Sequence, residues 1–143
     1  ADVCVAFAQG NIGKAVQLAT SDSFNEIKNS ALHLLKNVSK MEINDIIATV
    51  KSVSEFKIDI QDYLDFLAVW YRDILYFKAT RDSNGLIFKD ELNVITDQIN
   101  KSSYEGIENI LRGLQTAKTR LNANVNFDLT MELLFLLIKE NLV

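Results

Sequence analysis

Residues 60–77 read IQDYLDFLAVWYRDILYF, and this stretch decides the fold class. Its apolar side chains recur every three or four residues, which is the period of an α-helix and not the alternation of a strand. Two faces are apolar, one made of Ile60, Leu64, Leu67, Tyr71 and Ile74 and the other of Tyr63, Phe66, Trp70 and Phe77. A helix that is apolar on most sides has neighbours on several sides. We therefore predict a central helix, ~30 Å long, that crosses the domain.

The segments around this stretch carry amphipathic helical patterns. Each has one apolar face at helical spacing, beginning at Phe24, Ile43 and Tyr104. Residues 127–142 are apolar on more sides than one face requires, so this last helix is either central or covered by a partner chain. Proline is absent and glycine occurs five times, which disfavours all-β folds. The sequence predicts an all-α, multi-helix orthogonal or antiparallel bundle of about six main helices plus a short N-terminal helical remnant.

Helix starts are marked by capping residues. Ser followed three residues later by Glu forms a capping box, and this pattern predicts helix starts at Ser23, Ser39 and Ser102. Single capping side chains are expected from Asp59 before the central helix and from Asn126 before the last one. The two clearest turns are expected at residues 82–85 and 122–126, which are rich in Asn and other turn-forming residues.

Charge and residue counts exclude several classes of function. The formal net charge of -4 is opposite to the basic excess of most nucleic-acid-binding domains, so no direct nucleic-acid binding is expected. One cysteine, Cys4, and one histidine, His33, provide no cluster of metal ligands, and no metal or cofactor is expected. The apolar run Leu133–Ile138 is far shorter than the ~18 residues that span a membrane. A cytoplasmic, non-catalytic helical domain is the simplest interpretation.

The most distinctive tetrapeptide is Trp70-Tyr71-Arg72-Asp73. Trp, Tyr and Arg dominate the energetics of protein interfaces, which fits a protein-binding hot spot. The alternative is that Trp70 and Tyr71 pack in the core, while Arg72 and Asp73 form ion pairs and hydrogen bonds that orient the central helix. Sequence alone leaves both open.

Two motifs stand far apart in the chain. Residues 70–75 read WYRDIL, an aromatic-Arg-Asp-apolar pattern on the central helix. Residues 121–132 follow the pattern Leu-x-x-Asn-Val-Asn-x-x-Leu-x-x-Glu, in which the polar positions are Asn124, Asn126 and Glu132. Together these motifs resemble the helical collar domain of bacterial DNA polymerase III clamp-loader subunits, in particular those of the delta-prime type.

The resemblance implies a domain organisation. Residues 8–15 are similar to the end of the lid domain of clamp-loader ATPase modules, where ATP-hydrolysing relatives carry an Arg at the position of Gly13. Loss of that Arg agrees with the delta-prime type, which does not hydrolyse ATP. Residues 1–20 are then expected to be the C-terminal tail of a lid domain, and residues 21–143 the collar. The chain begins with Ala rather than Met, so an upstream module is expected.

The resemblance also implies a function. Collars from five subunits of this family form a ring, so the expected role is non-catalytic oligomerisation within the loader that places the sliding clamp in DNA replication. The expected partners are the other clamp-loader subunits, of the gamma/tau and delta types, through collar contacts. Asn124 and Asn126 are assigned to turn and N-cap geometry. The structural and interaction candidates are Trp70, Tyr71, Arg72, Asp73, Asn124, Asn126 and Glu132.

Two alternatives from other classes stay open. One is a small helical enzyme or ligand-binding domain with a pocket beside Trp70 and Tyr63, which needs a buried carboxylate of raised pKa or a bound ligand. The other is a helical adaptor, unrelated to replication, that binds one partner helix. A deep polar pocket favours the enzyme, whereas a flat apolar side face favours the collar or the adaptor.

Overall fold

A computed structural model describes residues 22–142, apart from the side chains of Ser23, Lys57 and Ile58. Within that range there are six α-helices and no strand, which confirms the predicted all-α bundle. The expectations for residues 1–20 and for the cap at Ser23 lie outside the described part. The helices are α3 (Asp22–Asn37), α4 (Ile43–Val53), α5 (Ile60–Thr80), α6 (Leu92–Lys101), α7 (Tyr104–Asn122) and α8 (Phe127–Glu140).

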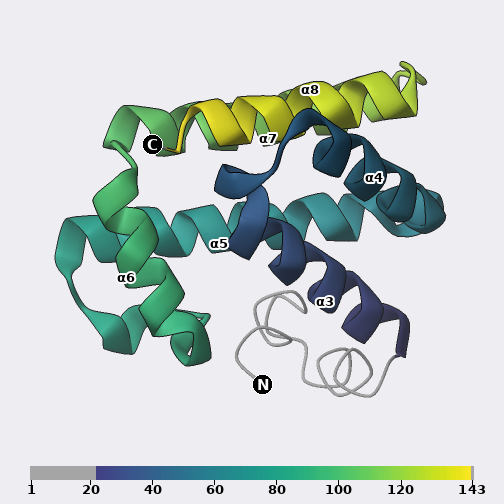
Figure 1. Cartoon of the computed structure of the whole chain (residues 1–143). Coiled ribbons are helices and arrows are strands. Elements are labelled where there is room, and N and C mark those ends of the chain that lie inside the picture. The colour runs from purple at the N-terminus through teal and green to yellow at the C-terminus, as the bar shows by residue number, and fades with distance from the viewer. Residues whose placement is uncertain (1–21, 143) are drawn as a thin grey trace.

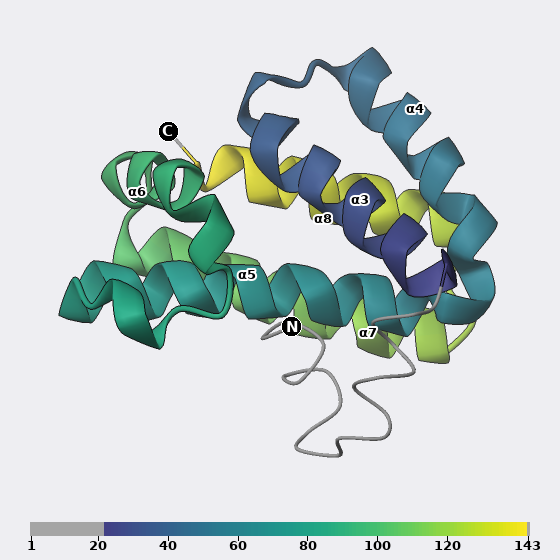
Figure 2. The same ribbon diagram turned by 90° about the horizontal axis from the view of Figure 1, so that it is seen from below.

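Helix α5 is the central element of the bundle. It packs against α3, α6 and α7, and α8 packs against α7 on one side and α4 on the other. Figure 1 shows α5 lying across the molecule beneath the α7 and α8 pair, with α6 crossing it near one end. Seen from below, α3 and α6 cover different halves of α5 (Figure 2). Both apolar faces predicted for α5 are therefore covered.

Two turns of α5 form the centre of the core. Trp70 and Tyr71 are completely buried, as are Tyr63 and Phe66 one to two turns earlier. Phe88, from the loop before α6, packs its ring against Trp70 at a centroid distance of 5.2 Å. Aromatic pairs at such distances contribute about 0.5–1.5 kcal/mol beyond the apolar area that they bury.

Carbonyl groups in the last turns of three helices accept hydrogen bonds from side chains of neighbouring helices. The last four carbonyls of an α-helix have no partner within the helix. Gln98 of α6 donates to the Leu35 carbonyl of α3 at 2.9 Å, and Lys78 of α5 donates to the Ile99 carbonyl of α6 at 2.9 Å. The Tyr104 hydroxyl of α7 donates to the Lys78 carbonyl at 3.0 Å. These bonds fix where the helices end relative to one another.

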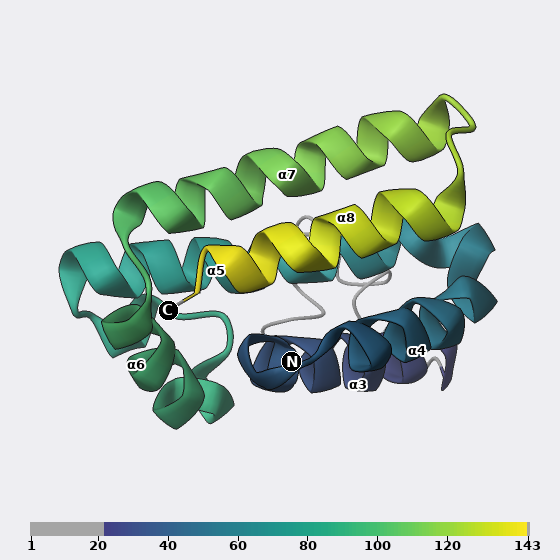
Figure 3. The same cartoon turned by 45° about the horizontal axis from the view of Figure 1, so that its top comes forward.

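Helices α7 and α8 form an antiparallel hairpin joined by a tight turn (Figure 3). Asn124 adopts a left-handed conformation with φ 59°. Its N–H and that of Val125 donate to carbonyls in the last turn of α7, at 3.1 and 3.0 Å, in the arrangement of a Schellman motif. Asn126 then accepts a hydrogen bond from the Leu129 N–H at 2.9 Å and caps α8, which confirms the predicted cap.

Three other predicted capping details need correction. The start of α4 is capped by Glu42 and Asp45 in a capping box, while Ser39 lies in the preceding 3₁₀ turn. The cap of α7 is Ser103 and not Ser102, because the Ser103 hydroxyl accepts from the Gly106 N–H at 2.9 Å. Asp59 occupies the position before α5, but its side chain makes no capping bond. Neighbouring polar residues compete for each cap, and the tertiary position of the helix selects one.

The turn expected at residues 82–85 is present as a 3₁₀ turn over Ser83–Gly85, in which the Asp82 side chain accepts from the Asn84 N–H at 3.0 Å. The left-handed residue is Arg81, at the end of α5, with φ 58°. Gly85 lies against the ring of Tyr76, where an added Cβ would come within 2.3 Å of the Tyr76 hydroxyl oxygen. Close approach to an aromatic side chain, rather than a positive φ, is therefore the reason for glycine at this position.

Candidate interaction surface

The sequence-predicted residues do not gather in one place. Trp70 and Tyr71 are fully buried, so neither side chain is available to a partner. Arg72 is exposed on α5, and within residues 22–142 its side chain makes no ion pair or hydrogen bond. Asn124 and Asn126 form the exposed turn between α7 and α8, and Glu132 is half-buried on α8. Trp70 and Tyr71 therefore belong to the core, whereas Asn124 and Asn126 shape the turn and the cap between α7 and α8.

Asp73 holds the loop between α5 and α6. Its Oδ2 accepts a hydrogen bond from the Phe88 N–H at 2.7 Å, and its Oδ1 accepts one from the Ile87 N–H at 3.1 Å. Burial raises the pKa of this carboxyl above its usual value, and the two backbone hydrogen bonds partly offset that rise. Both oxygens have backbone partners, so the carboxylate positions the chain that carries Phe88 against the core.

Tyr63 and Tyr71 provide no polar site either. Both hydroxyls are buried and have no hydrogen-bond partner in the described part of the chain. Burial raises the pKa of both hydroxyls well above the usual value, and for Tyr63 the neighbouring Tyr71 adds to the rise. These side chains therefore act as neutral aromatic packing. The three surface hollows described below are lined by neither Tyr63 nor Trp70, so the pocket required by the enzyme alternative is not among them.

Large apolar side chains are exposed on two neighbouring helices. Ile43 and Ile47, one turn apart on α4, are 63% and 49% exposed, and Leu129 and Leu133, one turn apart on α8, are 53% and 46% exposed. Helix α4 packs against α8, so the two pairs lie on adjoining elements. We call these four residues the α4–α8 apolar surface. Exposed apolar groups of this kind mark sites of association when they cluster.

Sequence reasoning left open that a partner chain covers the last helix, but it missed the α4 half of this surface because it treated the residues from Ile43 onward as one apolar face turned to the core. Only Ile46, Val50 and Val53 of that helix are buried. The width of the apolar face of α4 could have predicted these exposed residues from the sequence. Five Ile and Val side chains in 11 residues are more than one helix contact covers.

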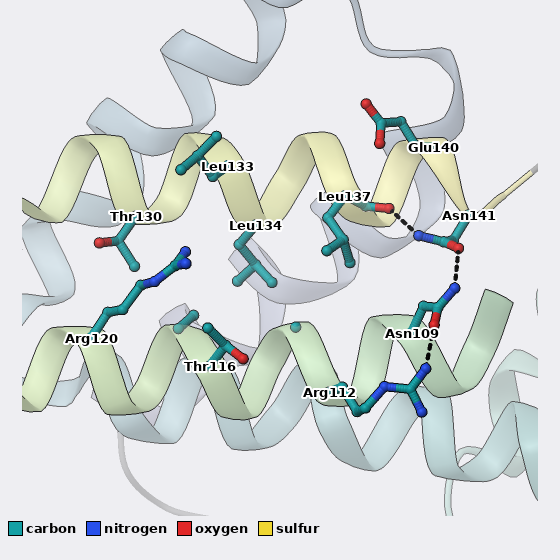
Figure 4. Close-up of a pocket in the computed structure, with 12 residues that line it drawn as sticks. Asn109, Arg112, Thr116, Arg120, Thr130, Leu133, Leu134, Leu137, Glu140 and Asn141 are labelled. Atoms are coloured by element: carbon teal, nitrogen blue, oxygen red, sulfur yellow. Dashed lines mark hydrogen bonds between the residues drawn. The ribbon is translucent and has the colours of Figure 1, made fainter. Parts of the chain in front are cut away.

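A groove runs along the α7–α8 hairpin, with a volume of about 480 Å³ (Figure 4). We call it the α7–α8 groove. Its floor contains Leu133, Leu134 and Leu137 from α8, and Arg112 and Arg120 from α7 form part of its wall. Two further hollows are lined by His33 and residues of α4, and by the outer face of α7. All three open widely to solvent and differ from the enclosed pockets that bind small ligands.

Residues 22–142 contain no group of three His, Cys, Asp or Glu side chains arranged to hold a metal ion. His33 is exposed on α3 and lies outside any such cluster. No helix in the same range combines the length and apolar character needed to cross a bilayer.

Comparison with known proteins places the chain in a family. The profile of the family described as "DNA polymerase III, delta subunit, C terminal" matches residues 24–140. The chain belongs to this family. The match covers every helix of the described bundle apart from the first residues of α3. The resemblance drawn from residues 70–75 and 121–132 is therefore confirmed at the level of the family.

A curated relative supports the same family assignment. The chain is 26% identical over 133 residues to DNA polymerase III subunit delta′ of Bacillus subtilis (strain 168). The aligned part is 91% of this chain but only 40% of the relative, so the chain spans less than half the length of that protein. No solved structure gives a significant match.

Proposed function

We propose that this domain joins a DNA polymerase III clamp loader by packing against the C-terminal domains of other loader subunits, of the gamma/tau and delta types. Residues 21–143 form the oligomerisation domain, and residues 1–20 belong to the end of a preceding lid domain. The domain itself catalyses no reaction and supports loading of the sliding clamp in cytoplasmic DNA replication. The family match and the delta′ relative support this assignment.

The observation that carries the proposal is the α4–α8 apolar surface. Its four side chains, Ile43, Ile47, Leu129 and Leu133, remain between 46% and 63% exposed, although the core beneath them is closed. Covering the exposed part of each contributes about 1 kcal/mol to association. A standard interface buries about 800 Å² per partner, and the faces of one or two helices supply such an area.

The enzyme alternative has less support from the described residues. Its buried carboxylate of raised pKa exists at Asp73, but both oxygens accept backbone N–H groups. The helical-adaptor alternative uses the same kind of surface and differs only in the partner. Arg72, exposed on α5, and Glu132, beside Leu133 on α8, remain candidates for polar contacts at the edge of an interface.

Light scattering after size-exclusion chromatography tests the proposal. The full-length protein is mixed with gamma/tau-type and delta-type subunits from the same source, and a heteromeric peak is expected. The Ile47→Lys, Leu129→Lys double variant should lose that peak while its circular dichroism spectrum is unchanged, because both side chains are exposed. Asn93→Lys, at an exposed site on α6, is the matched control and should assemble like the wild type. A double variant that assembles normally rejects the α4–α8 apolar surface as the interface.

A further inference from the structure

The α7–α8 groove has a basic–apolar–basic order along its length. Arg112 and Arg120 are eight residues apart on α7 and so stand ~12 Å apart along the helix axis. Between them, the floor is mainly aliphatic and includes Leu133 and Leu137 of α8, and Thr116 and Thr130 add two hydroxyl groups. Figure 4 shows the Arg120 side chain reaching from α7 toward α8, and Arg112 near the opposite end of the groove.

The two guanidinium groups are not neutralised within the described part of the chain. Arg112 donates only to the neutral Asn109 side chain, and Arg120 has no ion pair or hydrogen bond from its side chain. Lys118, on the same helix, is paired with Asp65 of α5 and serves the fold instead. Two unpaired cations beside an apolar floor are notable in a chain of net charge -4. The groove therefore favours an occupant that carries negative charge.

Side-chain hydrogen bonds hold the polar end of the groove in position. Asn109 bonds to Asn141 at 3.2 Å, and Asn141 bonds to the Leu137 carbonyl at 2.8 Å, so a chain of hydrogen bonds ties α7 to the end of α8. Arg112 is held at this end by Asn109. One carboxylate, Glu140, also lines the groove, but Figure 4 shows its side chain directed away from α7. The wall facing an occupant thus keeps a positive charge.

We propose that the α7–α8 groove receives a helix of a neighbouring loader protein whose face has the order acidic, aliphatic, acidic. The two carboxylates lie seven or eight residues apart and pair with Arg112 and Arg120, and the aliphatic side chain between them contacts Leu133 and Leu137. This inference rests on the proposed function, since it names the chemistry of the partner. Helices that bind in grooves use anchors spaced by three, four and seven residues, which matches this order.

The test compares charge-reversal variants of the full-length protein. The dissociation constants for gamma/tau-type and delta-type subunits are measured by titration calorimetry at ~0.1 M and ~0.5 M salt, where exposed charges are screened to different degrees. The Arg112→Glu, Arg120→Glu double variant should bind one of these subunits at least about tenfold more weakly, and most of the salt dependence should disappear. Arg81→Glu, outside the groove, should bind like the wild type. Unchanged melting of each variant shows that the fold is intact.

The outcomes separate this inference from the proposed function. If the wild type binds neither type of subunit, the proposed function fails. If the wild type binds and the double variant binds equally well, only the groove inference fails. Reversing a pair of exposed Asp or Glu residues, seven or eight apart on a helix of the partner, to Lys should restore binding of the double variant. If no such pair restores binding, or if the double variant loses affinity for a DNA duplex but not for the loader subunits, the inference is overturned.

Discussion

Asp73 illustrates how one buried charge organises a loop. Its carboxylate lies in the core and accepts two backbone N–H groups, from Ile87 and Phe88. Burial raises its pKa, because the charged form loses hydration, and the hydrogen bonds partly compensate. The loop thus depends on a group whose charged form is costly in the folded state.

The pH dependence of stability tests this balance. A carboxyl whose pKa is raised on folding stabilises the protein most below the pKa of the unfolded chain, and this contribution is lost as the pH rises through the folded-state pKa. Relative to Asp73→Asn, which does not titrate, the wild type should therefore gain stability between pH 7 and pH ~4. Urea unfolding of both proteins across this range measures the difference. A difference that falls on acidification means that the hydrogen bonds outweigh burial and depress the pKa.

Gln98 joins three helices through two buried hydrogen bonds. It accepts from the Trp70 indole N–H at 3.1 Å and donates to the Leu35 carbonyl at 2.9 Å. Gln98→Leu leaves both of these buried groups unpaired and should lower the free energy of unfolding by about 2–4 kcal/mol. Chemical unfolding measures the loss, with Asn100→Leu, an exposed change on the same helix, as the control. Equal stability of the two variants would show that water replaces the glutamine.

Asn126 should contribute to stability through its cap. The side chain satisfies the Leu129 N–H at 2.9 Å, one of the unpaired donors at the start of α8. Asn126→Ala should therefore cost about 1 kcal/mol, measured as a lower melting temperature. Asn122→Ala, in the last turn of α7, removes a similar exposed amide without affecting a cap and should change stability less. No difference between the two variants would argue against a contribution from the cap.

At the scale of elements, small residues set the distance between α7 and α8. A Cβ added at Gly106 would lie 2.9 Å from the carbonyl oxygen of Asn141, whereas one added at Gly113 would lie 2.8 Å from a methyl group of Leu137. The first obstacle is backbone and the second is the end of a flexible side chain. The α7–α8 hairpin should therefore accept a larger side chain at Gly113 more easily than at Gly106.

This difference predicts unequal losses of stability for the same substitution at the two glycines. Gly106→Ala should destabilise the domain by about 1–3 kcal/mol, because overpacking against backbone forces the helices apart. Gly113→Ala should stay within about 1 kcal/mol of the wild type, because the helix propensity of alanine offsets a small movement of Leu137. Each variant is the control for the other in thermal unfolding. Equal losses would mean that the two helices move as a rigid pair.

At the scale of the whole molecule, the net charge and the placement of the arginines bear on whether the chain binds DNA. The chain carries a net charge of -4, and Arg112 and Arg120 lie beside an apolar floor rather than among other basic residues. A continuous basic surface is what neutralises the phosphates of DNA. We therefore expect this chain to bind protein partners rather than DNA.

The corresponding prediction is that the chain alone does not bind a labelled primer–template duplex. Fluorescence anisotropy at ~0.15 M salt should show no binding below about 100 µM, which is the weak end of non-specific affinity. The Arg112→Glu, Arg120→Glu double variant should behave identically. Micromolar binding by the wild type that weakens steeply with salt would contradict this prediction.

The sequence alone determined the helices and the central position of α5. Helical periodicity reflects interactions between residues three and four apart, which are present in any chain with that pattern. The turn at Asn124 and the cap at Asn126 were predictable for the same reason, because a short polar side chain acts on its own backbone. The motifs at residues 70–75 and 121–132 also indicated the family that the comparison confirmed.

Only the tertiary structure decided which apolar and polar groups are covered. Ile46 and Ile47 are adjacent in sequence, yet Ile46 is 2% exposed and Ile47 is 49% exposed, because α4 packs against α8 on one side and leaves another side open. Gln98 finds its acceptor 63 residues away, at a carbonyl that no local pattern identifies. The α4–α8 apolar surface and the α7–α8 groove arise in the same way. Coverage depends on contacts between distant segments, and local periodicity carries no information about them.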